Sequence, residues 1–252
     1  MSPAATEGAA ALRALHRPGE PVVLPNAWDA AGAKRFEEAG FSAIATTSSA
    51  VAASIGRADH ELAPADEMLA AVARIVAAVS VPVTADLEAG YGLSPDELVS
   101  ALVGTGAVGL NLEDTDHSRG ELGDPERNAE RLAAVKQAAS DQGVDVVLNA
   151  RVDTYLHPGE PEERLEEAVR RARLYAEAGA DCVYPILMAD REAVRRFVAE
   201  AGAPVNIFAG RGLFRLAELA ELGVARVTFG GSLQATALNA AVEQLAEFTA
   251  GS

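Results

Sequence analysis

Residues 81–92 read Val-Pro-Val-Thr-Ala-Asp-Leu-Glu-Ala-Gly-Tyr-Gly and join a short apolar run to a loop that contains glycine. The β-branched run predicts a buried strand, and Asp86 and Glu88, two positions apart, are expected on the same side of the chain where that strand ends. Two carboxylates held side by side repel each other and lose hydration, and a divalent cation with oxygen ligands relieves both costs. The stretch therefore indicates a Mg²⁺ or Mn²⁺ site, with a solvated acidic loop as the alternative.

Acidic residues also follow other predicted strands. Residues 109–114 form a second apolar run that ends in carboxylates, the first of them Glu113, and Asp59 follows an earlier strand and loop. In a parallel α/β barrel the carboxyl ends of the strands meet at one rim, where active sites gather. This arrangement favours the metal site over the solvated loop and makes Asp86, Glu88 and Glu113 candidate metal-binding residues.

Strand-like runs alternate with helical segments along the whole chain, which predicts an α/β fold, namely one (β/α)₈ TIM barrel domain spanning residues 1–252. The predicted strands are residues 21–27, 41–47, 81–86, 108–113, 144–151, 181–187, 204–209 and 226–230. The segments between them, such as 125–139 and 161–178, are rich in Ala, Glu, Arg and Leu, as is typical of helices. Residues 1–8 are expected to form a flexible terminus.

The composition excludes several classes of partner. The formal net charge is −16 at pH 7, and both nucleic acid and anionic membranes need a basic surface on the protein that binds them. The single cysteine, Cys182, excludes an intramolecular disulfide and lies in a strand-like run, which is typical of a buried position. No signal peptide or transmembrane run is visible. We therefore expect a cytoplasmic protein that binds neither nucleic acid nor membrane.

Lysine usage narrows the chemistry. The chain has only two lysines, Lys34 and Lys136, and both fall within predicted helices outside the barrel. A Schiff-base enzyme needs a lysine inside the barrel mouth, so that mechanism is disfavoured. Stabilisation of an enolate by a metal ion remains the favoured mechanism, with a small anionic carboxylate as the expected substrate.

Five sequence motifs, in this order, resemble those of the isocitrate lyase and phosphoenolpyruvate mutase superfamily. They are PNAWD at 25–29, TTSSAVAASIGRAD at 46–59, TADLEAGYG at 84–92, NLED at 111–114 and NARVDTYL at 149–156. The resemblance runs from about residue 20 to about residue 235 and covers most of the chain. It implies a (β/α)₈ barrel enzyme that uses Mg²⁺, with Mn²⁺ as the other candidate metal, and that breaks or forms C–C or C–P bonds through enolate intermediates.

The resemblance also implies roles for the acidic residues. Asp86 falls on the residue that binds Mg²⁺ directly, and Glu88 and Glu113 fall on carboxylates that hold the metal mainly through water. Asp59 falls on an acidic residue of a mobile loop near the substrate, which makes it a candidate catalytic residue.

Further residues are implied as substrate contacts. The segment that binds the substrate carboxylate in the family corresponds to Thr47, Ser48 and Ser49. Arg151 lies in an arginine motif at a strand end, where a planar guanidinium can bind a carboxylate in a bidentate manner. A structural ion pair of Arg151 with Asp153 or Glu113 is the alternative. Two asparagines near the rim are either substrate contacts or residues that orient other groups, and these are Asn111 and Asn149.

The loop after the fourth strand departs from the family pattern. Superfamily lyases that release glyoxylate or pyruvate carry Lys-Lys-Cys-Gly-His or Lys-Arg-Cys-Gly-His there, whereas residues 114–124 contain no cysteine. Cleavage of isocitrate or methylisocitrate is therefore disfavoured. The Glu-Asp-Lys sequence of the mutases is also absent, since Thr115 follows the acidic pair. His117 in this loop is a candidate proton donor to an enolate, with a solvated loop histidine as the alternative.

These observations predict a Mg²⁺-dependent carbon–carbon lyase that cleaves a small 2-oxo or 2-hydroxy carboxylate by decarboxylation or retro-aldol chemistry. The first alternative is C–P bond chemistry of the phosphoenolpyruvate mutase or phosphonopyruvate hydrolase type. Less favoured are a phosphate-binding isomerase or synthase barrel, indicated by the glycines at 210–212 and 230–231, and a non-catalytic metabolite-binding barrel. The resemblance further implies a homo-oligomer, a dimer or tetramer, whose subunits exchange the last helix, within residues 232–248.

Overall fold

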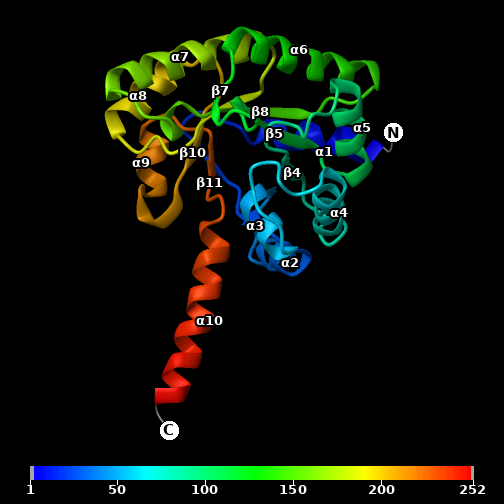
Figure 1. Cartoon of the computed structure of the whole chain (residues 1–252), viewed down its shortest axis with the longest axis vertical. Helices are drawn as coiled ribbons and strands as arrows, with labels where there is room; N and C mark the ends of the chain where they lie inside the picture. Colours follow the sequence, from blue (N-terminus) through cyan, green and yellow to red (C-terminus); the bar gives the residue numbers. More distant parts are fainter. Residues whose placement is uncertain (1–2, 251–252) are drawn as a thin grey trace.

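The computed structural model describes residues 3–250 and shows parallel strands surrounded by helices (Figure 1). Each predicted strand segment contains an observed strand that is shorter than predicted, the first segment is split in two, and β8 runs one residue past its predicted end. The strands of the ring are β1 (Val22–Val23), β2 (Asn26–Ala27), β3 (Ile44–Thr46), β4 (Val83–Asp86), β5 (Gly109–Glu113), β8 (Val147–Val152), β9 (Cys182–Pro185), β10 (Asn206–Phe208) and β11 (Arg226–Thr228). The predicted α/β architecture is confirmed.

The strand pairings close into a ring. Pairing runs without a break from β2 through β3, β4, β5 and β8 to β9, and all of these strands are parallel. A bridge between Val183 and Val205 joins β9 to the segment that leads into β10, and β10 pairs with β11, which pairs with β1. The backbone N–H of Leu24, between β1 and β2, donates to Val227 O at 2.9 Å. The chain therefore has the topology of an eight-position barrel.

Helices follow the strands and lie outside the ring (Figure 1). They are α1 (Pro3–Ala14), α2 (Ala30–Glu38), α3 (Ser48–Ser54), α4 (Ala65–Val76), α5 (Pro95–Thr105), α6 (Pro125–Asp141), α7 (Pro161–Glu177), α8 (Arg191–Glu200), α9 (Leu216–Glu221) and α10 (Ser232–Ala250), with short 3₁₀ turns η1 (Thr154–Leu156) and η2 (Gly210–Gly212). Lys34 lies on α2 and Lys136 on α6, outside the ring as predicted, and Cys182 is fully buried as predicted. Within residues 3–250 no helix is both long and apolar enough to cross a membrane.

Local signals explain where the helices begin and end. At the start of α5, Ser94 Oγ accepts from the N–H of Glu97, and the Glu97 carboxylate accepts from the N–H of Ser94, which is a capping box. Asp124 accepts from the N–H of Arg127 at the start of α6. Gly106 ends α5 with φ of 83°, a conformation that favours glycine. These short connections return the chain so that β4 and β5 end at the same rim.

The N-terminal segment, where a flexible terminus was predicted for residues 1–8, contains the start of the first helix, and that flexibility stays a prediction. From Pro3 onward the chain is helical in α1, and residues 1–2 lie outside the described part. Ala9 and Leu12 of α1 are buried in one cluster with apolar side chains of the strands, including Val147 of β8. Burial of this apolar helix face supplies the stabilisation that a solvated terminus would lack.

The interior of the ring is polar as well as apolar. Branched apolar side chains dominate the interior of most such barrels, but here Asn149, Asn206 and Arg226 are fully buried. His16, which follows α1, is also buried, and its Nδ1 donates to Leu12 O at 2.8 Å. Burial and the positive charge of Arg226 lower the pKa of His16 from its ordinary value of 6.5 to about 4. The folded protein therefore keeps His16 neutral.

His16 gives a prediction about stability and pH. Below pH 6.5 the unfolded chain binds a proton at His16 that the folded protein does not bind, so this contribution to stability is lost as the pH falls from about 6.5 to about 4. The linked loss is on the order of 2 to 3 kcal/mol. Urea denaturation at pH 7 and pH 4.5 should show a smaller acid-induced loss in His16→Gln than in the unmodified chain. The control is His157→Gln in a loop, and equal losses in all three proteins would contradict the prediction.

Candidate active site

The register of β4, β5 and β8 places the polar residues in rows. Asp86 pairs with Asn111 and Asn111 with Asn149, while Glu113 pairs with Arg151 two residues further along the strands. Residues in register on parallel strands point to the same side of the sheet. The strand-end residues that the sequence singled out are therefore neighbours at the carboxyl rim.

Asp86 is buried at the end of β4, where one of its oxygens is free of hydrogen bonds. Its Oδ2 accepts from the N–H of Ser48 at 3.1 Å, and its own N–H donates to Thr46 Oγ1 at 2.9 Å. Its Oδ1 is buried and has no hydrogen-bond partner among the described residues. An unpartnered buried carboxylate oxygen is costly, and a bound cation offsets that cost. The amide of Ser48, implied as a substrate contact, is here occupied by Asp86.

Glu88 connects two loops of the rim. Its Oε1 accepts from Tyr91 Oη at 2.8 Å and its Oε2 from the N–H of Glu61 at 2.7 Å. Burial, and then the nearby carboxylate of Asp59, raise the pKa of Glu88 to about 7. Glu88 also has a left-handed backbone with φ of 50°, a strained conformation of the kind that clusters at functional sites. The raised pKa shows that negative charge is crowded here, and the φ angle marks a strained backbone at the same residue.

Glu113 lies between a guanidinium and an imidazole. Its Oε2 is 2.6 Å from Arg151 Nη2, although this ion pair lacks hydrogen-bond alignment, and its Oε1 is 2.5 Å from His117 Nε2. Burial raises the pKa of Glu113 to about 7 against the lowering effect of these two cations. His117 Nε2 also lies 4.0 Å from Glu88 Oε2. His117 thus contacts two of the candidate metal-binding residues, and its role as a proton donor stays a prediction.

Arg151 forms the ion pairs that were the alternative to substrate binding. Its Nε and Nη2 donate to the two oxygens of Asp153 at 2.7 and 2.9 Å, in addition to the contact with Glu113. Its Nη1 donates to none of the described residues, although Arg151 lines the cavity described below. The ion pairs therefore fix the plane of the guanidinium through Nε and Nη2, and the role of Arg151 in substrate binding stays a prediction.

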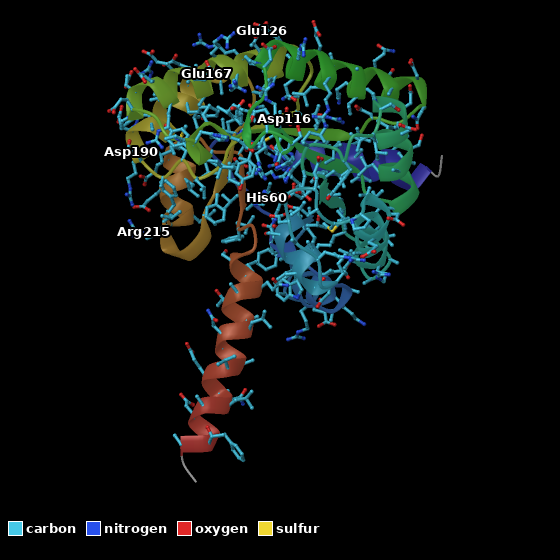
Figure 2. All side chains as sticks on the ribbon, viewed as in Figure 1. His60, Asp116, Glu126, Glu167, Asp190 and Arg215 are labelled. Carbon is cyan, nitrogen blue, oxygen red and sulfur yellow. The ribbon has the colours of Figure 1, made fainter. Side chains whose placement is uncertain are left out.

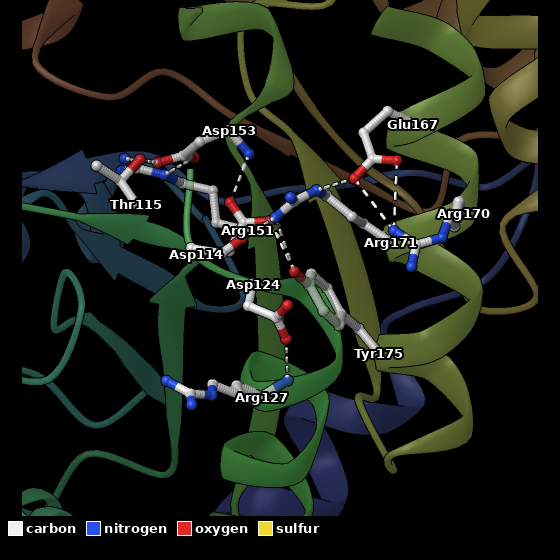
Figure 3. Close-up of polar contacts among 11 residues, drawn as sticks. Asp114, Thr115, Asp124, Arg127, Arg151, Asp153, Glu167, Arg170, Arg171 and Tyr175 are labelled. Atoms are coloured by element: carbon white, nitrogen blue, oxygen red, sulfur yellow. Dashed lines mark hydrogen bonds and ion pairs between the residues drawn. The ribbon is translucent and has the colours of Figure 1, made fainter. Parts of the chain in front are cut away.

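A second layer holds Asp153 in place, and Figure 3 shows its contacts. The N–H of Asp153 donates to Asp114 Oδ1 at 2.9 Å. Asp114 Oδ2 in turn accepts from Arg171 Nη1 at 2.9 Å and from Tyr175 Oη at 2.7 Å, both on α7. Thr115 Oγ1 donates to Asp153 Oδ2 at 2.5 Å. These contacts tie the ends of β5 and β8 to α7, so Arg151 is held by a continuous network.

The rim encloses a cavity of about 200 Å³. Most residues that the sequence proposed for substrate binding and catalysis line it, namely Thr47, Ser48, Ser49, Asp59, Asp86, Asn111 and Arg151. Glu88, Glu113 and His117 are not among its lining residues, and Asn149 lies in the row beside Asn111. His60 does line the cavity, and Figure 2 shows it near α3 on the side where α10 begins. The hairpin of β6 (Thr115–Asp116) and β7 (Glu121–Leu122) carries His117.

The far wall of the cavity was not visible in the sequence. It includes Leu156, Ile186 and Phe208. A Cβ atom at Gly210 or Gly230 would crowd the ring of Phe208, so these glycines make room for an aromatic wall. The space needed by Phe208 explains the glycines that had indicated a phosphate site in the sequence. The wall itself supplies apolar surface to the cavity. Only Phe208 of these three lies in a strand, and the apolar character of the three residues alone did not separate wall positions from ordinary core.

The acidic residues do not form a closed metal cage. Within residues 3–250, no three side chains of His, Cys, Asp or Glu converge closely enough to enclose an ion by themselves. Mg²⁺ commonly keeps several waters and binds through one or two carboxylates plus the substrate. The donor set therefore fits an ion bound directly by Asp86 Oδ1, and Glu88 and Glu113, whose pKa values the charge of Asp86 helps to raise, are the further carboxylates near it.

Comparison with known proteins places this fold and site in a family. The family model described as phosphoenolpyruvate phosphomutase matches residues 12–249, and the chain belongs to this family. An uncharacterised protein of Mycobacterium tuberculosis is 36% identical over 227 residues, which cover 90% of this chain and 84% of that protein. The resemblance to the superfamily seen in the sequence is confirmed.

Solved structures agree with the family. A protein of Burkholderia cenocepacia J2315 provisionally assigned as a phosphonomutase has a TM-score of 0.91 and 38% identity, covering 96% of this chain and 99% of that one. The structure of 2,3-dimethylmalate lyase, a member of the phosphoenolpyruvate mutase and isocitrate lyase superfamily, has a TM-score of 0.84 and 29% identity, covering 99% and 88%. The chain is therefore similar along its length to proteins assigned to both reaction types.

Proposed function

We propose that this chain is a Mg²⁺-dependent carbon–carbon lyase that cleaves a small 2-oxo or 2-hydroxy carboxylate through an enolate. The observation that carries the proposal is the cavity itself, in which the unpartnered Oδ1 of Asp86 and the available Nη1 of Arg151 belong to lining residues of one small space. A cation site beside an anion site is what binding of a metal-chelating carboxylate requires.

The metal assignment follows from the donors. Hard carboxylate oxygens favour Mg²⁺, with Mn²⁺ as a substitute. The ion would be held by Asp86, and through water by Glu88 and Glu113, and when bound it would polarise the substrate carbonyl as a Lewis acid. The raised pKa values of Glu88 and Glu113, about 7 in each case, reflect burial of charge that a cation would compensate.

The chain's own residues would bind and orient the substrate. Arg151 Nη1 would bind a carboxylate in the plane fixed by Asp153. Thr47 Oγ1 and Ser49 Oγ lie 3.3 Å apart at the edge of the cavity and would provide further hydrogen bonds. Asp59, which faces the cavity and raises the pKa of Glu88, is the candidate catalytic acid or base of the mobile loop. The apolar wall at Phe208 would keep water from the reacting bond.

The size of the cavity supports a small substrate. At about 200 Å³ it lies below the range of roughly 300 to 1,000 Å³ that is typical of sites for drug-sized ligands. The similarity to 2,3-dimethylmalate lyase supports the C–C reaction. The alternative of C–P bond chemistry is supported by the higher identity to the protein provisionally assigned as a phosphonomutase.

We also propose that α10 packs against a second copy of the chain in a dimer or tetramer. Figure 1 shows α10 extending away from the barrel, and none of its residues is buried. Leu238, Val242 and Leu245 expose apolar side chains at helical spacing on one face. Sedimentation equilibrium should show an oligomer, and Leu238→Lys together with Val242→Lys should weaken it. A chain that is monomeric at micromolar concentration would contradict this proposal.

The reaction is tested with a panel of substrates. Oxaloacetate, substituted malates and phosphonopyruvate are each incubated with the chain and Mg²⁺, and the products are followed by chromatography and by a coupled pyruvate assay. We expect C–C cleavage of at least one oxo- or hydroxy-dicarboxylate, abolished by chelation of the metal, because in these substrates the bond whose cleavage leaves an enolate is a C–C bond, whereas in phosphonopyruvate it is the C–P bond. Faster turnover of phosphonopyruvate than of every dicarboxylate would favour the C–P alternative.

The matched variant in this panel is Arg151→Lys. Lysine keeps the charge but lacks the planar fork, so kcat/KM should fall by roughly 10² or more, about 3 kcal/mol of transition-state stabilisation. Arg127→Lys on α6 serves as the control for loss of a guanidinium. Arg127 contacts Asp124 through its backbone N–H, which the substitution keeps. Near-normal kinetics of Arg151→Lys would return Arg151 to a purely structural role.

A further inference from the structure

We infer that Asn111 is a hydrogen-bond donor of fixed orientation to a substrate oxygen, and that Arg226 and Asn149 hold it in that orientation from inside the barrel. The inference rests on the proposed function, because it assigns a role within the same cavity. Asn111 is the member of the set that lines the cavity, whereas Arg226 and Asn149 are fully buried.

Arg226 is an unusual residue to find inside a barrel. It lies on β11, has no solvent exposure, and is the largest fully buried side chain in the described part of the protein. No carboxylate forms a salt bridge with it among the described residues, and its Nε and Nη1 have no hydrogen-bond partner there. Burial of an unpaired charge is costly. A function therefore explains the presence of this arginine better than a gain in stability does.

The contacts of Arg226 determine how the Asn111 amide is turned. Arg226 Nη2 lies 3.2 Å from Asn111 Oδ1. A guanidinium can only donate hydrogen bonds, so the Asn111 atom that faces it must be the oxygen. Asn149 Nδ2 donates to the same oxygen at 2.9 Å. Two donors therefore occupy Asn111 Oδ1, which leaves it poorly suited to bind a metal ion.

The remaining polar atom of Asn111 is its Nδ2. Asn111 Nδ2 donates to none of the described residues. It is also not one of the fully buried atoms without a partner, so it is open to the cavity. Since Asn111 lines the cavity, Nδ2 is the polar atom that this side chain offers to a ligand there. Asn111 stands in register with Asp86, so this donor lies beside the proposed metal-binding carboxylate.

This placement suits an oxygen that gains negative charge. A donor held rigidly at such an oxygen stabilises a transition state more than a ground state, because it need not reorient as charge develops. Removal of one donor of this kind typically lowers kcat by about 10² to 10³. Arg226 and Asn149 would be positioning residues, acting only through Asn111. The substrate must accordingly present an acceptor oxygen next to the atoms that chelate the metal.

The first test uses oxalate, a planar dicarboxylate that mimics an enolate, and measures its binding with Mg²⁺ by calorimetry. In Asn111→Leu, which removes both polar atoms, the affinity for oxalate should fall roughly tenfold or more, as expected for loss of one hydrogen bond to a charged group. The affinity for Mg²⁺ alone should stay unchanged. A loss of Mg²⁺ affinity in Asn111→Leu that is restored in Asn111→Asp would show that Asn111 binds the metal through oxygen, and would overturn the inference.

The second test asks whether Arg226 acts through Asn111. Arg226→Met should weaken oxalate binding in the unmodified background and have no further effect in the Asn111→Leu background. Independent, additive losses would contradict the relay, by which we mean the action of Arg226 and Asn149 on the ligand through Asn111. Asn149→Leu should behave in the same way, and it serves if Arg226→Met does not fold, as judged by circular dichroism. Cys182→Ala is the matched control, because Cys182 is buried in register with Asn149 but makes no side-chain hydrogen bond to it.

Failure of the reaction and failure of the relay give different results. If the unmodified chain binds oxalate with Mg²⁺ but turns over no member of the substrate panel, the proposed reaction fails while the binding cycle still tests the relay. If the unmodified chain does not bind oxalate with Mg²⁺, the inference is overturned together with the proposed site. Normal oxalate affinity in Asn111→Leu would overturn the relay alone.

Discussion

The in-register pairing of three parallel strands, β4, β5 and β8, is the constraint on which the site depends. It sets Asp86 beside Asn111 and Asn149, and Glu113 beside Arg151, without any contribution from the loops. Because side chains alternate from face to face along a strand, a slip of one residue would turn each row away from the cavity. The apolar shell between strands and helices fixes that register, so packing far from the rim decides the chemistry available at it.

The same arrangement buries several ionisable side chains at the rim and inside the ring. Glu88 and Glu113 have pKa values raised to about 7, and no carboxylate in the described part of the chain pairs with Arg226. Polar groups of this kind cost stability unless something compensates them. We interpret these buried groups as parts of a site that binds three ligand groups, namely a cation at Asp86, an anion at Arg151 and an oxygen atom at Asn111. This interpretation links the interior of the barrel to the cavity above it.

Much of the fold, and part of the site, could be predicted from the sequence. Alternation of apolar runs with helical segments located every strand of the ring, though not the hairpin strands β6 and β7, and the spacing of Asp86 and Glu88 placed both at one strand end, because these signals are local. The partners of Arg151 and the position of His117 beside Glu113 depend on which residues face each other across strands and on the shape of a hairpin. Arg226 had a local signal, a charge inside an apolar strand, but its contact with Asn111 joins residues 115 positions apart.

The central claim, that Asp86 is the residue at which a divalent cation binds, is tested most directly by metal binding in the absence of substrate. Titration of Mn²⁺, followed by electron paramagnetic resonance, should show one site in the unmodified chain. Loss of a direct ligand should weaken it by at least about 100-fold in Asp86→Asn, beyond the roughly 10- to 100-fold expected on loss of an outer-shell group, as in Glu88→Gln. Asp116→Asn, in the exposed hairpin, controls for the loss of one negative charge. Unchanged Mn²⁺ affinity in a folded Asp86→Asn protein would contradict the account.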